Sequence, residues 1–316
     1  EKDHLEKLSL FCNVDRSCVI VEKDVEYSIY EIPLILSKAG LDEIILDRFQ
    51  IERPASSLDD WENLLSVIRA PEGEVRIGMV GKYSELQDAY KSVDEALMHG
   101  GYALGKKVIV EKIAAEDIEL DPTILKNVDG ILIPGGFGSR GMEGKIMAAQ
   151  YAREEKIPFL GICLGLQCAV IDFSRNVCGL DGADSTEFDD ERAKKTPHPV
   201  VCLMEEQADV FEMGGTMRLG AYDCNLQVGS KVHLAYGDDT ISERHRHRYE
   251  VNNSYRNILE QNGMILSGLN PEIGVVEMIE LTGHPWFVAT QAHPELKSQP
   301  IKPHPLFKGF IEASAK

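Results

Sequence analysis

The segment Gly161–Gly165, which reads Gly-Ile-Cys-Leu-Gly, places a cysteine between two glycines at a sharp turn. An apolar run, Ile157–Leu160, precedes this segment, and a helical pattern, Leu166–Phe173, follows it. Because glycine has no β-carbon, the two glycines allow the backbone to crowd and to adopt dihedrals that other residues avoid. A strand, a tight turn and a helix in this order lift the side chain at the turn clear of a sheet. The segment therefore predicts an α/β fold with a cysteine at an elbow.

Cys163 has the surroundings of a nucleophile, and His293 is the best candidate for its base. At the start of a helix, unpaired amides and the helix dipole stabilise a thiolate. His293 and Glu295 lie two residues apart on an expected strand, and Pro294 holds the backbone between them extended, so both side chains leave the same face. The carboxylate can then orient the imidazole and stabilise its protonated form. Each residue alone is more often structural, but their convergence favours covalent catalysis.

A second glycine-rich segment, Pro134–Gly138, follows the apolar run Gly130–Ile133 and supplies candidate oxyanion donors. A thiolate that attacks a carbonyl generates a tetrahedral intermediate, whose oxygen needs hydrogen-bond donors. The amide of Leu164, directly after Cys163, is one candidate. The loop Gly135–Gly136 offers the other, because only glycine lets the main chain approach a substrate so closely. The two glycine-containing segments together predict a site for attack on a carbonyl.

Strand-like and helical patterns alternate from Val75 onward, which indicates a mostly parallel sheet with helices on both faces. The expected strands before the elbow are Val75–Val80, Lys107–Val110 and Gly130–Ile133, and the expected helices are Gln87–His99 and Glu143–Glu155. After residue 200 the patterns shorten to strand-like runs at Thr216–Leu219, Arg248–Val251, Gly274–Leu281 and Trp286–Gln291. Ligands of such sheets bind beyond the carboxyl ends of the strands, where the cysteine and the glycine loop are expected.

Three regions follow from these patterns. Residues 1–52 hold short apolar runs and a helical pattern, Tyr30–Ala39, which Gly40 closes, and we expect them to be the last elements of a domain. Residues 53–74 are expected to be a linker that includes a short helix, Trp61–Ile68. Residues 75–316 are expected to form a self-contained domain. Because the first residue is not methionine, we expect the chain to be a piece of a longer protein.

Charge and cysteine content exclude several classes of function. The chain has 33 Lys and Arg against 52 Asp and Glu, a net charge of −19, which argues against nucleic acid and anionic membrane as partners. No uninterrupted apolar stretch is long enough to span a bilayer. The 7 cysteines are irregularly spaced and form no CxxC pair, so we expect free thiols in a reducing, cytoplasmic location and neither disulfides nor a metal site.

The segment Gly100–Lys107 nearly matches a phosphate-binding loop, but two features speak against that interpretation. Lys107 stands where such a loop carries the Ser or Thr that ligates magnesium. A helix precedes the segment and a strand follows it, which is the reverse of the order in a phosphate-binding loop. We therefore expect a helix cap and a turn here, and no ATP site in this chain.

Several motifs together resemble a known family. Pro134–Gly138, Gly161–Gln167 and His293–Glu295 resemble the class I glutamine amidotransferase domain, a flavodoxin-like α/β fold with a cysteine nucleophile elbow. The resemblance extends to the CTP synthase family through Arg140–Gly141, Ser174–Asn176, Asp184–Phe188, Gly214–Gly220 and Glu243–Glu250. It covers residues 75 to about 310, and Tyr27–Leu34 look like the tail of the family's ATP-dependent synthetase domain.

The resemblance implies a role for each matching residue. Cys163 would form a glutamyl thioester, with His293 as acid and base and Glu295 as its orienter. Gly136 and Leu164 would make the oxyanion hole, and Gly136, Phe137 and Gln167 would line the glutamine pocket. Glu187 would hold the substrate's ammonium and Arg248 its carboxylate, which suits an amino acid with one charge of each sign. Without the family, Glu187 would be interpreted as a solvated loop residue and Gln167 as an ordinary helix residue, while Arg244 and Arg246 suit a solvated strand as well as a nucleotide contact.

The resemblance also implies partners. L-glutamine would be hydrolysed, and the ammonia would pass to the protein's own synthetase domain, where UTP becomes CTP at the expense of ATP with Mg²⁺. GTP would act as activator, and the full-length protein would be a cytoplasmic homotetramer. Two alternatives remain from the sequence: a glutaminase of the same fold, such as that of GMP synthetase, and a non-catalytic module for regulation or filament assembly.

Overall fold

The computed structural model describes the chain except for residues 1, 53–56, 83–86, 190–194 and 204–216. Two compact units make up the chain, Glu1–Glu72 and Gly73–Lys316. The predicted Gly214–Gly220 motif lies partly outside the described residues, as does the start of the predicted linker. None of the helices in the described ranges is both long and apolar enough to cross a membrane.

The first unit is helical. It contains α1 (Lys2–Cys12), α2 (Ile32–Lys38), α3 (Leu41–Phe49) and α4 (Asp59–Arg69), with 3₁₀ turns η1 (Arg16–Cys18) and η2 (Ile29–Glu31). Ser28 and Glu31 form a reciprocal capping box at η2, and Gly40, with φ of 79°, separates α2 from α3. The helical patterns expected at Tyr30–Ala39 and Trp61–Ile68 are confirmed. Leu64 and Leu65 are the only fully buried apolar side chains among the described residues of this unit.

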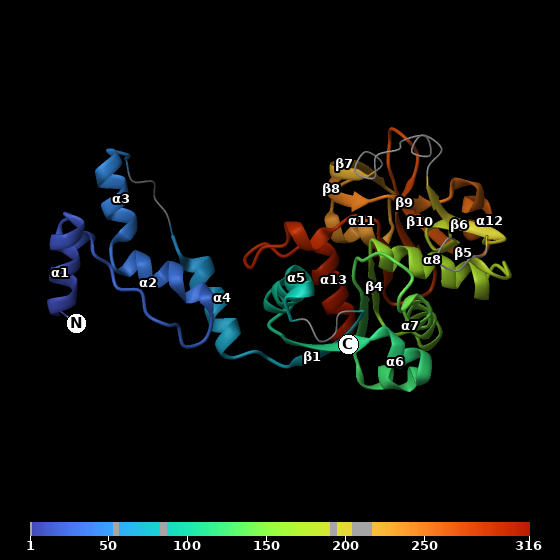
Figure 1. Cartoon of the computed structure of the whole chain (residues 1–316), viewed down its shortest axis with the longest axis horizontal. Coiled ribbons are helices and arrows are strands. Elements are labelled where there is room, and N and C mark those ends of the chain that lie inside the picture. Colours follow the sequence, from blue (N-terminus) through green and yellow to red (C-terminus); the bar gives the residue numbers. More distant parts are fainter. Residues whose placement is uncertain (1, 53–56, 83–86, 190–194, 204–216) are drawn as a thin grey trace. The chain divides into compact units, whose positions relative to one another are not determined.

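The second unit is built on a nine-stranded sheet of described residues, in the order β2-β1-β3-β4-β12-β11-β10-β7-β8 (Figure 1). The strands are β1 (Glu74–Gly81), β2 (Lys107–Ala114), β3 (Gly130–Ile133), β4 (Phe159–Ile162), β7 (Arg218–Leu226), β8 (Thr240–His247), β10 (Met264–Leu269), β11 (Val276–Leu281) and β12 (Phe287–Thr290). Pairings are parallel from β2 to β12 and antiparallel from β12 to β8. Only β7 and β11 therefore run opposite to the rest of the described sheet, which confirms the predicted mostly parallel α/β architecture.

Helices cover both faces of this sheet (Figure 1). One face packs against α5 (Lys91–Tyr102), α11 (Lys231–Tyr236) and α13 (Pro305–Ser314), and the other against α6 (Ala115–Leu120), α7 (Met142–Glu155), α8 (Leu164–Asn176) and α12 (Arg256–Gln261). Successive side chains of a strand point to opposite faces, so Phe159 joins the α7–α8 core and Leu160 the α5–α13 core. The two cores therefore pack against the sheet from both sides.

A smaller three-stranded sheet lies beside the end of α8. It consists of β5 (Ala183–Ser185), β6 (His198–Leu203) and β9 (Tyr249–Val251), and the 3₁₀ turn η5 (Thr186–Phe188) follows β5 directly. The further 3₁₀ turns are η3 (Gln87–Tyr90), η4 (Pro122–Asn127), η6 (Asn253–Tyr255) and η7 (Pro294–Lys297). The run expected at Arg248–Val251 is β9, and β8, directly before it, contains the residues that suited a solvated strand, but its buried face was not expected. Its sequence carries charged residues where an apolar face would have signalled a strand.

Candidate active site

Cys163 stands between β4 and α8, at the N-cap of that helix. Its φ of 52° and ψ of −101° are unusual for a residue with a side chain, and its amide donates a hydrogen bond of 2.7 Å to the carbonyl of Thr290 on β12. The neighbouring glycines are required by close packing. A β-carbon on Gly161 would lie 2.8 Å from the backbone of Gly165, and one on Gly165 would strike the carbonyl of Ile133. The elbow is therefore a strained turn that its two glycines permit.

His293 and Glu295 form a contact of 2.7 Å between Nδ1 and Oε1. The prediction that both residues lie on a strand is wrong, because β12 ends at Thr290 and His293 is the N-cap of η7. Pro294 occupies the first position of this 3₁₀ turn, where a backbone N–H would have no partner, so it begins the turn rather than extending a strand. The amide of His293 is fixed separately by the carbonyl of Arg244 at 2.7 Å.

The electrostatic environment of His293 favours its protonated form. Burial alone would lower the pKa of the imidazole, but the nearby sulfur of Cys163 and the carboxylate of Glu295 outweigh burial and raise this pKa to about 10. The second ring nitrogen, Nε2, is buried and lacks a well-formed hydrogen bond to any described residue. Nε2 is left available to exchange a proton with a ligand or with the thiol.

The glycine loop after β3 reaches the two reacting side chains. A β-carbon on Gly135 would lie 2.7 Å from Cε1 of His293 and 3.5 Å from Cβ of Cys163, so this backbone touches both. Phe137 is exposed, its carbonyl accepts a hydrogen bond of 2.6 Å from Nζ of Lys82, and the same ammonium lies 4.4 Å above its ring. The loop thus forms one wall of a site that contains the elbow.

An open cavity of about 810 Å³ brings the predicted residues together. Its lining comprises Lys82, Ala89, Tyr90, Gly135, Gly136, Phe137, Cys163, Gln167, Glu187, Met217, Arg246, His247, Arg248, Tyr249 and His293. Of the residues assigned from the sequence to catalysis, the oxyanion hole or glutamine binding, Glu295 and Leu164 are absent from this lining. Glu295 lies behind His293, and the side chain of Leu164 is buried in the core. The cavity carries a carboxylate on one element and guanidinium groups on another, which suits a small zwitterion.

Two of the predicted pocket residues are held by backbone groups. Glu187, in η5, accepts a hydrogen bond of 2.8 Å from the amide of Gly138 in the glycine loop. Gln167, on the first turns of α8, donates through Nε2 to the carbonyl of Tyr249 at 3.1 Å. These contacts couple the pocket walls to each other. The interpretations of Glu187 as a solvated loop residue and of Gln167 as an ordinary helix residue are therefore less favoured than they are from the sequence alone.

Gln291 and the inner face of β8 were not singled out from the sequence. Gln291 is buried, its Nε2 lies 3.6 Å from Sγ of Cys163, and its Oε1 lies 3.4 Å from Nε2 of Gln167. On β8 the side chains of Glu243, His245 and His247 are buried, whereas Arg244 and Arg246 are exposed, Arg246 at the open cavity. The alternation of the two sets is visible in the sequence, but its buried positions are polar. Polar residues at buried positions run against the usual rule, and so the pattern resembles a solvated strand.

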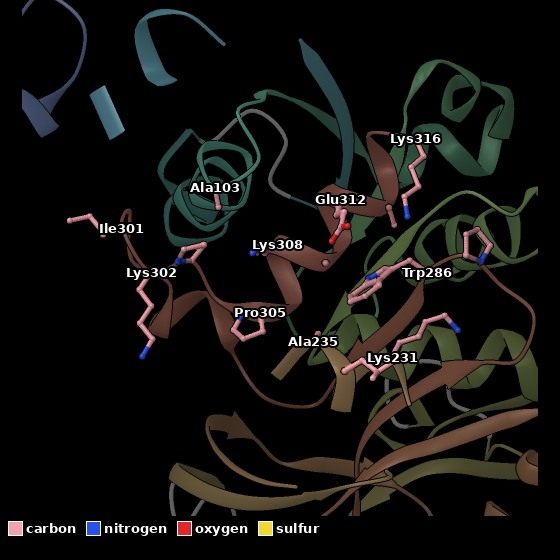
Figure 2. A pocket seen from close by; sticks show the side chains of 15 residues that line it. Ala103, Lys231, Ala235, Trp286, Ile301, Lys302, Pro305, Lys308, Glu312 and Lys316 are labelled. Carbon is pink, nitrogen blue, oxygen red and sulfur yellow. The ribbon is translucent and has the colours of Figure 1, made fainter. Parts of the chain in front are cut away.

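A second cavity, of about 710 Å³, lies over α13 and shares no residue with the first (Figure 2). Trp286, Lys302 and Lys308 are among its lining residues. No residue predicted to act in catalysis or substrate binding contributes to it.

The described ranges hold no group of three or more His, Cys, Asp or Glu side chains placed to bind a metal ion. All 7 cysteines are free thiols. The false phosphate-loop match is a helix end and a turn, as predicted: α5 ends at Tyr102, Gly105 has a φ of 67°, and β2 begins at Lys107.

Comparison with known proteins agrees with this geometry. Residues 85–313 match the family described as "Glutamine amidotransferase class-I". The glutaminase domain of Trypanosoma brucei CTPS, solved with bound acivicin, superposes with a TM-score of 0.70 at 39% identity, covering 76% of this chain and 94% of that one. The chain therefore belongs to the class I glutamine amidotransferase family.

Within that family the similarity is to CTP synthases. Residues 1–51 match the family described as "CTP synthase N-terminus". The CTP synthase of Caldanaerobacter subterraneus subsp. tengcongensis is 52% identical over 311 residues, which is 98% of this chain and 57% of that protein. The CTP synthase of Geobacillus kaustophilus is 49% identical over 313 residues, 98% of this chain and 58% of that protein. The chain thus spans somewhat more than half the length of these curated relatives.

Proposed function

We propose that residues 75–316 are the glutaminase domain of a CTP synthase and that Cys163, His293 and Glu295 hydrolyse L-glutamine. The observation that carries this proposal is the cavity in which the elbow cysteine, the His293–Glu295 pair and the glycine loop meet. The similarity to CTP synthases at 49% and 52% identity favours this assignment over a glutaminase of another enzyme with the same fold.

The first half of the proposed reaction makes a thioester. The Cys163 thiolate attacks the side-chain amide carbon of glutamine, and the carbonyl oxygen becomes an oxyanion held by the amides of Leu164 and Gly136. The carbon–nitrogen bond then breaks, and Nε2 of the His293 imidazolium gives its proton to the leaving nitrogen. Ammonia leaves, and a glutamyl group remains on the sulfur. The raised pKa of His293 supports this step, because the acid must be protonated when the amine departs.

The second half returns the enzyme to its starting state. A water molecule attacks the thioester carbon while neutral His293 removes one of its protons. The carbon–sulfur bond breaks, glutamate is released, and the thiolate and imidazolium form again. Glu295 stabilises the imidazolium in both halves, and its contact with Nδ1 keeps Nε2 directed to the reacting atoms.

Recognition of glutamine is assigned to the two charged walls of the cavity. Glu187 holds the α-ammonium and Arg248 the α-carboxylate, while Phe137 and Gln167 line the side-chain path. The anchoring of Glu187 to the glycine loop supports this assignment, because the same contact fixes the distance between the charge-binding and the reacting parts of the site.

The remaining assignments concern the longer protein. We assign residues 1–52 to the end of a synthetase domain and residues 53–74 to a linker, which the match of residues 1–51 supports. The ammonia would aminate UTP in that domain at the expense of ATP, with Mg²⁺ as cofactor and GTP as activator, in a cytoplasmic homotetramer. The chain itself would release ammonia without making CTP.

Labelling with a chloromethyl ketone analogue of glutamine tests the proposed function. We expect one adduct by intact mass, mapped to Cys163 and prevented by excess glutamine. Cys168 is the matched control on the same helix, because burial raises the pKa of its thiol to about 12 and leaves it unreactive. A Cys168→Ala protein should label like the wild type, whereas Cys163→Ala should not label. Adducts that glutamine does not prevent, or that persist in Cys163→Ala, would contradict the proposal.

A further inference from the structure

A chain of buried polar groups runs from the candidate glutamine pocket into the sheet. His247 lines the pocket and His245 lies behind it on β8, and both are almost fully buried. Nδ1 of His245 lies 2.9 Å from Nε2 of His247. Nδ1 of His247 in turn faces the carbonyl of Tyr249 at 3.3 Å and Oε1 of Glu250 at 3.5 Å. At the inner end, Nε2 of His245 lies 3.5 Å from Oε2 of Glu277 on β11.

Each of the three junctions in this chain needs a proton. Nδ1 of His247 faces the carbonyl of Tyr249 and a carboxyl oxygen of Glu250, so this junction needs a proton either on the ring nitrogen or on the carboxyl group of Glu250. The junction of the two imidazoles needs a second proton. At the inner junction, the nitrogen of His245 and the oxygen of Glu277 are both buried and lack a hydrogen-bond partner among the described residues. Without a proton these two atoms present lone pairs to each other, which is costly in a buried place.

Two neutral imidazoles supply only two of these three protons. The third must be an additional proton, whether it resides on a ring nitrogen or on the carboxyl group. The balance of buried charges also indicates one additional proton. Arg218 contacts Glu250 at 3.1 Å and Glu277 at 2.7 Å, so one buried cation faces two buried carboxylates. One extra proton makes this cluster neutral, and a neutral cluster avoids the cost of an uncompensated buried charge.

The outer end of the chain connects to the pocket. The carbonyl of Tyr249, which faces His247, also accepts a hydrogen bond from the side chain of Gln167. Arg248 lies between His247 and Tyr249 in the sequence. The main chain that carries Arg248 is therefore held by the histidine chain on one side and by α8 on the other.

We propose that His245 and His247 form a positioning relay that holds one proton more than two neutral imidazoles and thereby fixes the Arg248 wall of the glutamine pocket. Loss of this proton leaves a net negative charge behind that wall and loosens its binding of the substrate carboxylate. The inference rests on the proposed glutaminase function, because that function assigns Arg248 to the carboxylate of glutamine.

The surrounding ionisable groups indicate when the proton is lost. Those facing the two histidines are Arg218 and Tyr222 on β7, Glu243 on β8, Glu250 on β9, Glu277 on β11 and His293 after β12. Burial lowers the pKa of both histidines and raises that of Glu277, the latter against the pull of Arg218 and the Asn270 amide. Burial also raises the pKa of Glu250 to about 8, against the pull of Arg218. A raised carboxyl pKa means that the proton is present at neutral pH and is lost as the pH rises above about 8.

The experiment measures labelling of Cys163 by the chloromethyl ketone analogue at several concentrations, which separates its dissociation constant from its maximal rate. In the wild type we expect the dissociation constant to rise between about pH 7 and about pH 9.5. In Glu277→Gln the side-chain amide donates to His245 and accepts from Arg218 at every pH, so these contacts do not depend on the additional proton. We therefore expect the alkaline increase of the dissociation constant to be about tenfold smaller than in the wild type. Glu280→Gln is the control on the same strand, because Glu280 bonds the amides of Lys231 and Val232 instead. It should retain the rise of the wild type.

A second variant tests the positioning role. His247→Ala should raise the dissociation constant about tenfold at neutral pH and leave the maximal labelling rate within about twofold, since it removes one buried hydrogen bond and no reacting group. His247→Asn, whose amide nitrogen replaces Nδ1, should recover part of the affinity. If Glu277→Gln retains the alkaline rise, or if His247→Ala changes only the maximal rate, the relay is refuted. If wild-type Cys163 shows no glutamine-protected labelling, the proposed function falls and the relay with it.

Discussion

Replacing Glu295 by glutamine isolates the charge that supports His293. Glutamine is isosteric and can still accept the hydrogen bond from Nδ1, so orientation of the ring is kept while the negative charge is lost. The present pKa of His293, about 10, is raised by Cys163 and by Glu295 against the effect of burial. An opposite charge in direct contact shifts a pKa by about 1 to 3 units, or roughly 1.4 to 4 kcal/mol.

The expected direction of the change in the pKa of His293 follows from which form of the imidazole the negative charge of Glu295 stabilises. Glu295 stabilises the imidazolium, so its removal lowers the pKa of His293, and the protonated acid is lost at lower pH. The alkaline limb of the rate of glutamine hydrolysis, expressed as kcat/KM, should therefore move from near pH 10 to between about 7 and 9. Titration of the His293 ring by NMR should show the same displacement.

The control is Glu243→Gln, which changes the comparable buried pair of Glu243 and His304, 3.0 Å apart. It should leave the alkaline limb within about half a unit of its wild-type position, because none of the described contacts of His293 involves this pair. A limb that does not move in Glu295→Gln, or that moves to higher pH, would refute the reasoning.

Three further predictions concern binding and stability. Glu187→Gln should raise KM for glutamine about tenfold or more while the reaction of Cys163 with iodoacetamide stays unchanged, because a charged contact to the ammonium is lost; an unchanged KM would argue against its role. Gly165→Ala should lower the free energy of unfolding in urea by about 1 to 3 kcal/mol or abolish folding, because its β-carbon strikes the carbonyl of Ile133; full stability would contradict the packing. Asp172→Asn should cost about 3 kcal/mol in the same assay by breaking the buried pair with Arg153, whose two contacts measure 2.8 and 3.0 Å, and a loss below about 1 kcal/mol would show that the pair is dispensable.

The elements that follow local rules could be predicted from the sequence. The elbow is one example, because its glycines, its apolar strand and its helix are contiguous and each is required by local sterics. The alternation of strands and helices from Val75 onward is another, since the spacing of apolar residues reflects the two cores. The relation between Cys163 and His293 is not local, and its prediction rested on the chemistry of the two motifs and was strengthened by the resemblance to a family.

The features that were missed depend on tertiary structure. The segment at Pro294 reads as extended, because proline restricts its predecessor, yet the end of β12 leaves room for a 3₁₀ turn. Gln291 carries no signal of its own, since glutamine is common at surfaces and only the fold buries it beside Cys163. The inner face of β8 resembled a solvated strand, because its buried His245 and Glu243 find their partners on β11 and at the start of α13, far along the chain. In each case a contact far along the chain outweighs the local preference.

Capture of the covalent intermediate is the most direct test of the central claim. The chain is mixed with isotope-labelled glutamine, quenched in acid within the first turnover, digested and analysed by mass spectrometry. We predict a glutamyl group on the peptide that contains Cys163, released by hydroxylamine as expected of a thioester, and neither this adduct nor ammonia in Cys163→Ala. Release of ammonia by Cys163→Ala at the wild-type rate, or a glutamyl group on a different residue, would contradict the account.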